Sequence, residues 1–392
     1  VITFSIQLEN VGIINELSQE TVVIDIDSSD LLELNLHVMH QNSIVLSEAA
    51  NRFTNLNLFG SGTTDLGIIP NLITTFDAST SDANLFFNLV ENQTAVTTGS
   101  GDEKIVVTGG RNFIKTEIGD DSVTIDGGYH VVNTGSDNDV IGVAAGVNRI
   151  NTQSGRDSID IKNGTNTVNA GDDNDTITIS GGTNTVEGGG GDDTLTLTGG
   201  INFVESGDGN DTITASGGGS NVDIRSLDGG NGNDQLNIFS TGNVTLPTAV
   251  NIEQFFISDT VHQSLDFSFS TSLNGIELDS GTTIDNSTIA LTLGVGQSLT
   301  LDSITDGDTA AASLADGGIV IAQAASLSTL DLTLDDVGPA TSIANENVFI
   351  DIAGTSIATA QVTSVNDSFV VIENSGSALT WLNLTGTGTL GI

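Results

Sequence analysis

Residues 170–179 read Ala-Gly-Asp-Asp-Asn-Asp-Thr-Ile-Thr-Ile, and residues 188–197 read Gly-Gly-Gly-Gly-Asp-Asp-Thr-Leu-Thr-Leu. Each stretch places an acidic residue between a turn rich in glycine or aspartate and a short strand in which apolar residues alternate with threonine. The arrangement recurs at one constant interval, and once at a longer one, with its acidic residue at Glu103, Asp121, Asp139, Asp157, Asp175, Asp193, Asp211 and Asp234. Equal spacing predicts equal structure, so we expect these carboxylates to stack in one column.

Apolar residues repeat with the same period and predict the core. Two neighbouring columns face inward after the acidic residue: Ile105, Val123, Ile141, Ile159, Ile177, Leu195, Ile213 and Leu236, and Val107, Ile125, Val143, Ile161, Ile179, Leu197, Ala215 and Ile238. The opposite wall is predicted from Ile114, Val132, Ile150, Val168, Val186, Val204 and Val222. Alternation at period two indicates strands with one buried face, and glycine and β-branched residues disfavour helices. The fold predicted is all-β, a right-handed parallel β-solenoid with about 18 residues per coil, one repeat in each.

Three segments are expected along the chain. The strict repeat covers residues 99–240, whereas 1–98 and 241–392 keep the alternation without the period. In these flanks we predict irregular β-solenoid, for example at Leu31–Leu36, Leu72–Phe76 and Leu265–Phe269, with a β-sandwich as the alternative for the C-terminal part. The chain begins without methionine, which suggests a segment of something longer.

Composition limits the classes of function. The 392 residues include 51 Asp and Glu against 8 Lys and Arg, for a net charge of -43, and no Cys. Such a charge argues against nucleic acid and anionic membranes as partners, and no stretch of the sequence is long and apolar enough to insert into a membrane. Disorder would be the default for an acidic, glycine-rich chain, but 37% hydrophobic residues in strict alternation argue for a folded one.

The predicted carboxylate column needs positive charge. Neighbouring coils lie ~4.8 Å apart, and two carboxylates at that distance repel by roughly 3 kcal/mol at an effective dielectric constant of about 20. Calcium takes six to eight oxygen ligands and accepts carboxylates together with backbone carbonyls, which glycine turns can offer. Magnesium is less suitable because it requires strict octahedral geometry. We therefore predict several Ca²⁺ ions along this edge, held by the eight acidic residues.

These residues resemble the calcium-binding nonapeptide of the repeats-in-toxin (RTX) proteins, Gly-Gly-x-Gly-x-Asp-x-apolar-x. Residues 188–196 and 229–237 match it at every fixed position, and 206–214 misses only the first glycine. The remaining repeats match in part, and Glu103 replaces the aspartate in the first. The resemblance implies a β-roll whose turns bind calcium.

This chain departs from the RTX pattern on the alternate half-turns. Asparagine recurs there at Asn112, Asn148, Asn166, Asn184 and Asn202, with His130 in one place. Stacked Asn side chains can hydrogen-bond along a column. We therefore expect calcium on one edge only and an asparagine ladder on the other.

The flanks resemble the β-rich segments of bacterial surface-layer (S-layer) proteins of the Caulobacter type, as in residues 53–62, 72–79 and 246–255. That resemblance implies a protein exported by type I secretion to the extracellular bacterial cell surface, where it folds with calcium and self-assembles. Its partners would be further copies of itself and cell-surface polysaccharide or lipopolysaccharide.

Two other interpretations stay open. The chain could be a segment of an RTX adhesin or biofilm-matrix protein, or a carbohydrate-active β-helix enzyme. The sequence contains neither His-Glu-x-x-His nor Gly-x-Ser-x-Gly, and the scarcity of basic residues disfavours a lyase groove. No catalytic residue and no organic cofactor site is predicted.

Overall fold

In a computed structural model the chain is an all-β protein, a parallel β-solenoid of about 14 turns with about 18 residues per turn, together with a small separate sheet. The structure describes residues 53–91, 93–217 and 221–239 without a break; before and after these it describes the strands given below and short stretches beside them. No helix occurs among the described residues, which confirms the predicted fold class. In the same part of the chain, no helix is long and apolar enough to cross a membrane.

The chain divides into two compact units, Val1–Gly190 and Gly191–Ile392. The predicted boundaries at residues 98 and 240 are a different division and stay a prediction. Strands of the first unit are β1 (Ile2–Glu9), β2 (Ile14–Asn15), β3 (Ser18–Gln19), β4 (Val22–Ile24), β5 (Leu31–Met39), β6 (Gln41–Leu46), β7 (Asn55–Ile69), β8 (Thr75–Asp77), β9 (Asp82–Val90), β10 (Ala95–Thr97), β11 (Lys104–Thr108), β12 (Arg111–Lys115), β13 (Ser122–Asn133), β14 (Val140–Asn151), β15 (Ser158–Ile161), β16 (Thr165–Asp172), β17 (Thr176–Ile179) and β18 (Thr183–Gly190).

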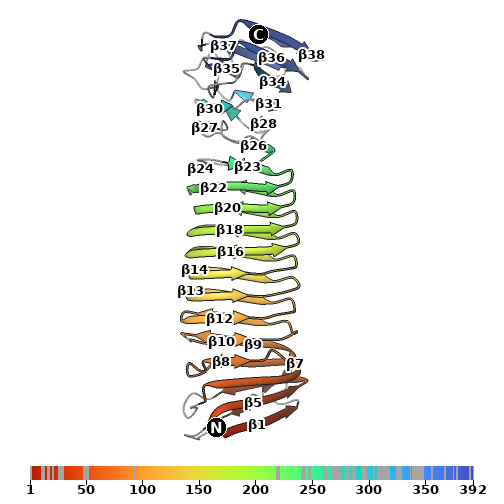
Figure 1. Ribbon diagram of the computed structural model, residues 1–392, viewed down its shortest axis with the longest axis vertical. Helices are drawn as coiled ribbons and strands as arrows, with labels where there is room; N and C mark the ends of the chain where they lie inside the picture. Colours follow the sequence, from red (N-terminus) through yellow and green to blue (C-terminus); the bar gives the residue numbers. More distant parts are fainter. Residues whose placement is uncertain are drawn as a thin grey trace. The chain divides into compact units, whose positions relative to one another are not determined.

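Two walls of parallel strands enclose the core of the first unit, with each coil lying directly on the next (Figure 1). The acid wall follows the acidic residues and contains β9, β11, the first halves of β13 and β14, β15 and β17. The asparagine wall contains β8, β10, β12, the second halves of β13 and β14, β16 and β18. Strands β13 and β14 are long enough to contribute to both walls.

The predicted apolar columns form the core. Ile105, Val123, Ile141, Ile159 and Ile177 pair in register on successive strands and are all buried. On the asparagine wall the column from Ile114 to Val186 is equally buried. β-Branched side chains pack well on a pleated surface, so the coil spacing is filled by residues that already prefer strands.

Strands of the second unit are β19 (Thr194–Leu197), β20 (Gly200–Asp208), β21 (Thr212–Ala215), β22 (Val222–Asn231), β23 (Gln235–Phe239), β24 (Val244–Thr245), β25 (Ala249–Val250), β26 (Gln254–Ser258), β27 (Ser264–Asp266), β28 (Gly275–Leu278), β29 (Thr283–Ile284), β30 (Thr288–Leu293), β31 (Ser298–Asp302), β32 (Thr305–Asp306), β33 (Gly318–Gln323), β34 (Thr329–Asp335), β35 (Val348–Ile352), β36 (Thr359–Ser364), β37 (Ser368–Glu373), β38 (Trp381–Gly386) and β39 (Leu390–Gly391).

Towards the C-terminus the solenoid continues with longer, unequal coils. Strands β26, β28, β31, β34, β36 and β38 pair in parallel as one wall, and β27, β30, β33, β35, β37 and β39 as another. Leu299 pairs with Leu332 and Leu332 with Val362, so the strict period is absent while the parallel winding remains. The irregular solenoid predicted for this segment, rather than a sandwich, matches these pairings.

Two predictions of detail were wrong, and one reaches beyond the described residues. Val204 pairs with Leu227 and not with Val222, because a register shift between Asn202 and Phe203 absorbs the longer coil there. The strand predicted at Leu72–Phe76 starts only at Thr75, because Pro70 begins a turn that the Ile73 N–H closes on its carbonyl at 3.0 Å. Of the strand predicted at Leu265–Phe269, residues 267–269 lie outside the described residues.

Candidate functional site

The eight predicted acidic residues occupy one structural position in successive coils. Each lies immediately before a strand of the acid wall or its counterpart in the second unit, from Glu103 before β11 to Asp234 before β23. All eight side chains are buried, with at most 2% of their surface exposed. The structure therefore confirms the predicted stacking, as one run from Glu103 to Asp175 in the first unit and another from Asp193 to Asp234 in the second.

Within each run the carboxylates accept hydrogen bonds from the backbone of the preceding coil. The N–H of Asp121 donates to Oδ1 of Asp139 at 2.9 Å, and that of Asp139 to Oδ1 of Asp157 at 2.8 Å. The same bond joins Glu103 to Asp121, Asp157 to Asp175, Asp193 to Asp211 and Asp211 to Asp234, at 2.7–2.9 Å. One oxygen of each acceptor thus has a structural role, which is to satisfy a buried turn amide.

Sequence reasoning missed one member of the column. Oε2 of Glu253 accepts the N–H of Asp234 at 2.8 Å, so Glu253 continues the second run by one coil. The signal was present in the sequence, because Glu253 directly precedes β26 as the other acids precede their strands. Its interval from Asp234 differs from those of the other repeats, which hid it from a search for a fixed period.

The second carboxylate oxygen is different. Oδ2 of Asp121, Asp157, Asp211 and Asp234 is buried and has no hydrogen-bond partner. A hydroxyl lies beside three of them, but each such hydroxyl is also within hydrogen-bond distance of a backbone carbonyl of the following coil, to which it can donate its single proton. Thr116 donates to the Thr134 carbonyl at 2.9 Å and Thr152 to the Ala170 carbonyl at 2.7 Å, for example. Glu103 is the exception in part, because the Thr98 hydroxyl donates to its Oε2.

Burial also changes the acidity of the column. Removal from water raises the pKa of Glu103 to about 9, of Asp139 to about 7, and of Asp121 and Asp234 to about 6. The pKa of Asp157 and of Asp211 is raised for the same reason. Desolvation disfavours the charged form of a carboxyl, so these groups need either a proton or a cation near neutral pH.

The turns before most of the acids share one backbone feature. The residues four and two positions ahead of the acid have positive φ from Asp121 onward, including the non-glycine residues Glu117, Asp137, Gln153 and Asp173 at φ 70–79°. At Gly155 (φ 129°) a Cβ would lie 1.9 Å from the Asp137 carbonyl oxygen of the preceding coil, so only glycine fits there. Repeats that match the RTX motif poorly therefore fold into the same turn as those that match it well.

A second, exposed row lies one residue before the acids. The N–H of Asn138 donates to Oδ1 of Asp120 at 2.9 Å, and the N–H of Arg156 to Oδ1 of Asn138 at 3.0 Å. These bonds point to the preceding coil, whereas those of the buried column point to the following one. Adjacent turn amides are thus satisfied from both neighbouring coils.

The donors at this edge suit a hard cation. Carboxylate oxygens without a partner and tightly curved backbone are what calcium uses, and no sulfur or imidazole lies in the column. The described residues do not bring three or more acidic or histidine side chains together around one point. An ion held by Asp121, Asp139 or their equivalents would therefore need backbone carbonyls or water to complete its ligands.

The opposite edge carries the predicted asparagine ladder. Nδ2 of Asn148 donates to Oδ1 of Asn166 at 2.9 Å, and Nδ2 of Asn166 donates to Oδ1 of Asn184 at 2.9 Å. Each amide also donates to the carbonyl three residues earlier, as Asn166 does to Asn163 at 3.2 Å. Both amide hydrogens are thus used, and this edge needs no ligand to satisfy them.

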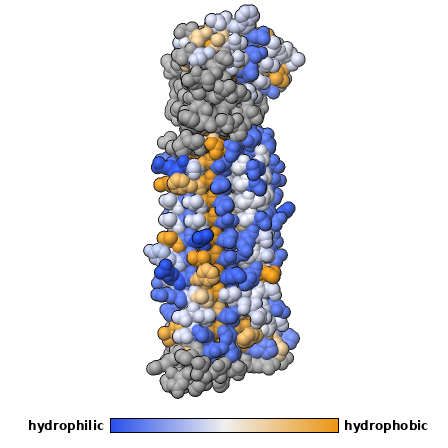
Figure 2. Space-filling view, viewed as in Figure 1, coloured by the Kyte–Doolittle hydropathy of each residue, from blue (hydrophilic) through white to orange (hydrophobic). Residues whose placement is uncertain are grey.

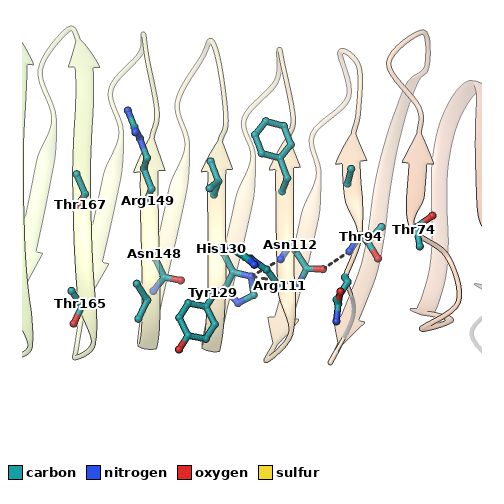
Figure 3. Close-up of a pocket in the computed structure, with 15 residues that line it drawn as sticks. Thr74, Thr94, Arg111, Asn112, Tyr129, His130, Asn148, Arg149, Thr165 and Thr167 are labelled. Atoms are coloured by element: carbon teal, nitrogen blue, oxygen red, sulfur yellow. Dashed lines mark hydrogen bonds between the residues drawn. The ribbon is translucent and has the colours of Figure 1, made fainter.

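His130 takes an asparagine's place in this ladder (Figure 3). Its Nδ1 accepts the N–H of Asn112 at 3.3 Å, and its Nε2 lies 2.7 Å from the Gly127 carbonyl, to which it can donate. Burial lowers the pKa of His130. The neutral ring therefore reproduces the acceptor and one of the two donors of an asparagine, and Oδ1 of Asn148 in the next coil has no hydrogen-bond partner.

No protein-family model matches the chain, and no curated protein or solved structure is significantly similar to it.

Proposed function

We propose that this chain is a secreted structural protein of the bacterial cell surface that folds and self-assembles when it binds calcium, most specifically as an S-layer lattice protein. The observation that carries the proposal is the column of buried carboxylates, one per coil, in which oxygens such as Oδ2 of Asp121 and Asp157 have no partner, beside turns with positive φ. The RTX-like repeats at residues 188–196 and 229–237 support calcium as the ion.

A cation is a better neutraliser than protons outside a cell. Asp121 and Asp234, with pKa values of about 6, lose most of their protons at neutral pH. Ionised neighbours at ~4.8 Å would then repel each other through a poorly solvated edge. Bound calcium would supply positive charge between coils. The carboxylates of Asp121, Asp139 and Asp157 would hold it, while their Oδ1 atoms keep the turn amides in place.

Coupling of binding to folding follows from the same geometry. The column exists only when coils are stacked, so an ion that needs two coils binds the folded chain and not the unfolded one. Such a ligand stabilises the fold by mass action, by about 2.7 kcal/mol per site at a concentration 100 times its Kd. A protein of this kind remains unfolded where calcium is scarce and folds where it is abundant, which suits export followed by assembly.

The test is a calcium titration of the whole chain after chelation. We expect loss of β circular dichroism in excess EGTA, recovery with calcium, and little recovery with magnesium. Asp193→Ala should weaken several calcium sites together, because adjacent coils share ions. An unchanged spectrum in EGTA, or loss of one independent site only, would contradict the calcium column. Electron microscopy of the native cell surface would then test for an ordered lattice.

A further inference from the structure

One face of the first unit contrasts in charge with the rest of the chain. Six of the eight Lys and Arg residues lie between Lys104 and Lys162. On the asparagine wall, the outward positions from β10 through β16 up to Asn169 include Arg111, Lys115 and Arg149 and no acidic residue. Acidic side chains return on either side, at Asp77 in β8 and Glu187 in β18. We use the term groove face for the outward side of the asparagine wall from β10 through β12, the second halves of β13 and β14, and β16 up to Asn169.

Apolar side chains are exposed in the middle of this face. Phe113 pairs with Val131 and Val131 with Arg149 on successive strands, forming one outward row. Tyr129 lies beside Arg111 in the neighbouring row and is 60% exposed, and Phe113 is 48% exposed. Figure 2 shows apolar residues gathered along the middle of one face of this unit, among hydrophilic ones.

The surface is hollowed there. A groove of about 550 Å³ runs from Thr74, just before β8, across the wall to β16 and is lined by Tyr129, Phe113, Arg111 and Arg149 among others. A second hollow of about 320 Å³ continues it past Asn151 and Asn169 to Glu187, where the acid-free part of the surface ends. Five strand spacings give a length of about 24 Å. In Figure 3, Arg111, Tyr129 and Arg149 come from three successive strands of the same wall.

The two arginines have no acidic partner. Among the described residues, ion pairs join Lys115 to Glu117 and Arg225 to Asp223, and neither Arg111 nor Arg149 takes part in one. Both side chains are exposed, on β12 and β14, and lie two strand spacings apart in neighbouring rows, so their Cα atoms are about 12 Å apart. In a chain with 51 acidic residues, two unpaired arginines beside exposed aromatic rings are well placed for an anionic ligand.

We propose that the groove face binds a linear oligosaccharide that carries carboxylate groups. Aromatic rings offer apolar faces to the C–H side of sugar rings, arginine binds a carboxylate with two parallel hydrogen bonds, and the Thr and Asn rows offer partners to hydroxyl groups.

A sugar polymer fits this face better than an extended peptide. Strands β10, β12, β13, β14 and β16 are each paired on both sides, so a peptide would find no backbone edge to extend. Sugar chains bind through side chains alone. The long, shallow groove that follows the stack of coils also suits a linear chain. The inference does not depend on the calcium column, which lies on the turn edge.

The experiment measures binding of a hyaluronan decasaccharide, which has a carboxylate on every second sugar, to the full chain by calorimetry in constant calcium. Uncharged chitohexaose and poly-L-glutamate are the comparison probes. Arg149→Gln and Tyr129→Ala each remove one element of the groove, and Lys104→Gln and Phe86→Ala are matched controls. Lys104 and Phe86 are exposed neighbours on the opposite wall. Circular dichroism verifies that each variant is folded.

We expect saturable hyaluronan binding with a Kd below about 1 mM, weakened about tenfold by Arg149→Gln and by Tyr129→Ala and unchanged in the controls. Chitohexaose should bind more weakly. The proposal is overturned if hyaluronan does not bind or if the control variants weaken binding equally. It is also overturned if poly-L-glutamate binds as well, which would indicate an acidic protein partner. Loss of self-association in Arg149→Gln without any glycan binding would assign the face to a second copy instead.

Discussion

Asp139→Asn distinguishes a calcium column from a column of protonated acids. Asp139 has no exposed surface, and its Oδ1 accepts the Asp121 N–H at 2.9 Å. Asparagine keeps that oxygen and replaces Oδ2 with an amide group. The substitution therefore removes a buried charge and leaves the turn hydrogen bond in place. Asp126→Asn, at an exposed position of β13, is the matched control for the change in charge.

The magnitude follows from the acidity of the group. Burial raises the pKa of Asp139 from 3.8 to about 7. At pH 8 the group is ionised in both the folded and the unfolded chain, and its burial then lowers the free energy of unfolding by about 4 kcal/mol relative to a carboxylate with an unshifted pKa. In chelator, Asp139→Asn should recover much of this and raise the free energy of unfolding. In calcium the same change removes a ligand. Losing two flanking ions at 100 times their Kd would remove about 5 kcal/mol of binding free energy, which outweighs the gain of about 4 kcal/mol and leaves a net loss of about 1 kcal/mol.

The assay is urea unfolding followed by circular dichroism at pH 8, with wild type, Asp139→Asn and Asp126→Asn, in EDTA and in millimolar calcium. The expected result is a change of sign: Asp139→Asn stabilises in EDTA and destabilises in calcium, while Asp126→Asn changes little in either. Stabilisation by Asp139→Asn in both solutions would refute the calcium column. Equal destabilisation in both would instead mean that the carboxylate acts through hydrogen bonds alone.

Three further outcomes test the ladders and turns. In EDTA the melting temperature should fall as pH rises from about 5 to 9, because the folded column binds more protons than the unfolded chain and loses them near the raised pKa values of about 6–9; a flat profile would contradict this. Gly155→Ala should lower the free energy of unfolding by more than about 2 kcal/mol, since its Cβ would lie 1.9 Å from the Asp137 carbonyl oxygen. Gly142→Ala, whose Cβ would have no atom within 4 Å, should change it little, and thermal unfolding of both variants measures the difference. Asn166→Ala should lower the free energy of unfolding, measured with denaturant, by about 2–3 kcal/mol, because the Asn163 carbonyl loses its donor. Asn151→Ala, which lies outside the ladder, should lower it much less.

Periodicity made the central fold predictable. A constant repeat length places Ile105, Val123 and Ile141 in register before any coordinates are known, because a parallel coil has no freedom to offset them. The same constant repeat length predicted that the acids stack in one column and the asparagines in another. Where coil length changes, the prediction failed: Val222 was placed by counting, whereas a bulge after Asn202 brings Leu227 opposite Val204.

Other features depend on geometry that no residue pattern states. Each turn amide of the column is satisfied by the next coil's carboxylate, so the acids have a structural role as acceptors as well as the predicted one as ligands. Glu253 joins the column at an interval that breaks the period, and only the backbone reveals it. The groove face was likewise not foreseen, because its arginines and aromatic residues are far apart in sequence and meet only through the register of β12, β13 and β14.

The two edges of the solenoid bear on how such a chain could change in evolution. Between Glu103 and Asp175 the amide–carboxylate hydrogen bonds of the acidic column join equivalent positions of consecutive repeats, and the hydrogen bonds from one asparagine to the next do the same. Deletion of one whole repeat, such as residues 140–157, would leave each partner facing an equivalent one. Tandem duplication would do so equally. The length of this stack can therefore change in increments of about 4.8 Å without altering either edge. An insertion that is not a whole repeat must instead protrude from the stack as a loop.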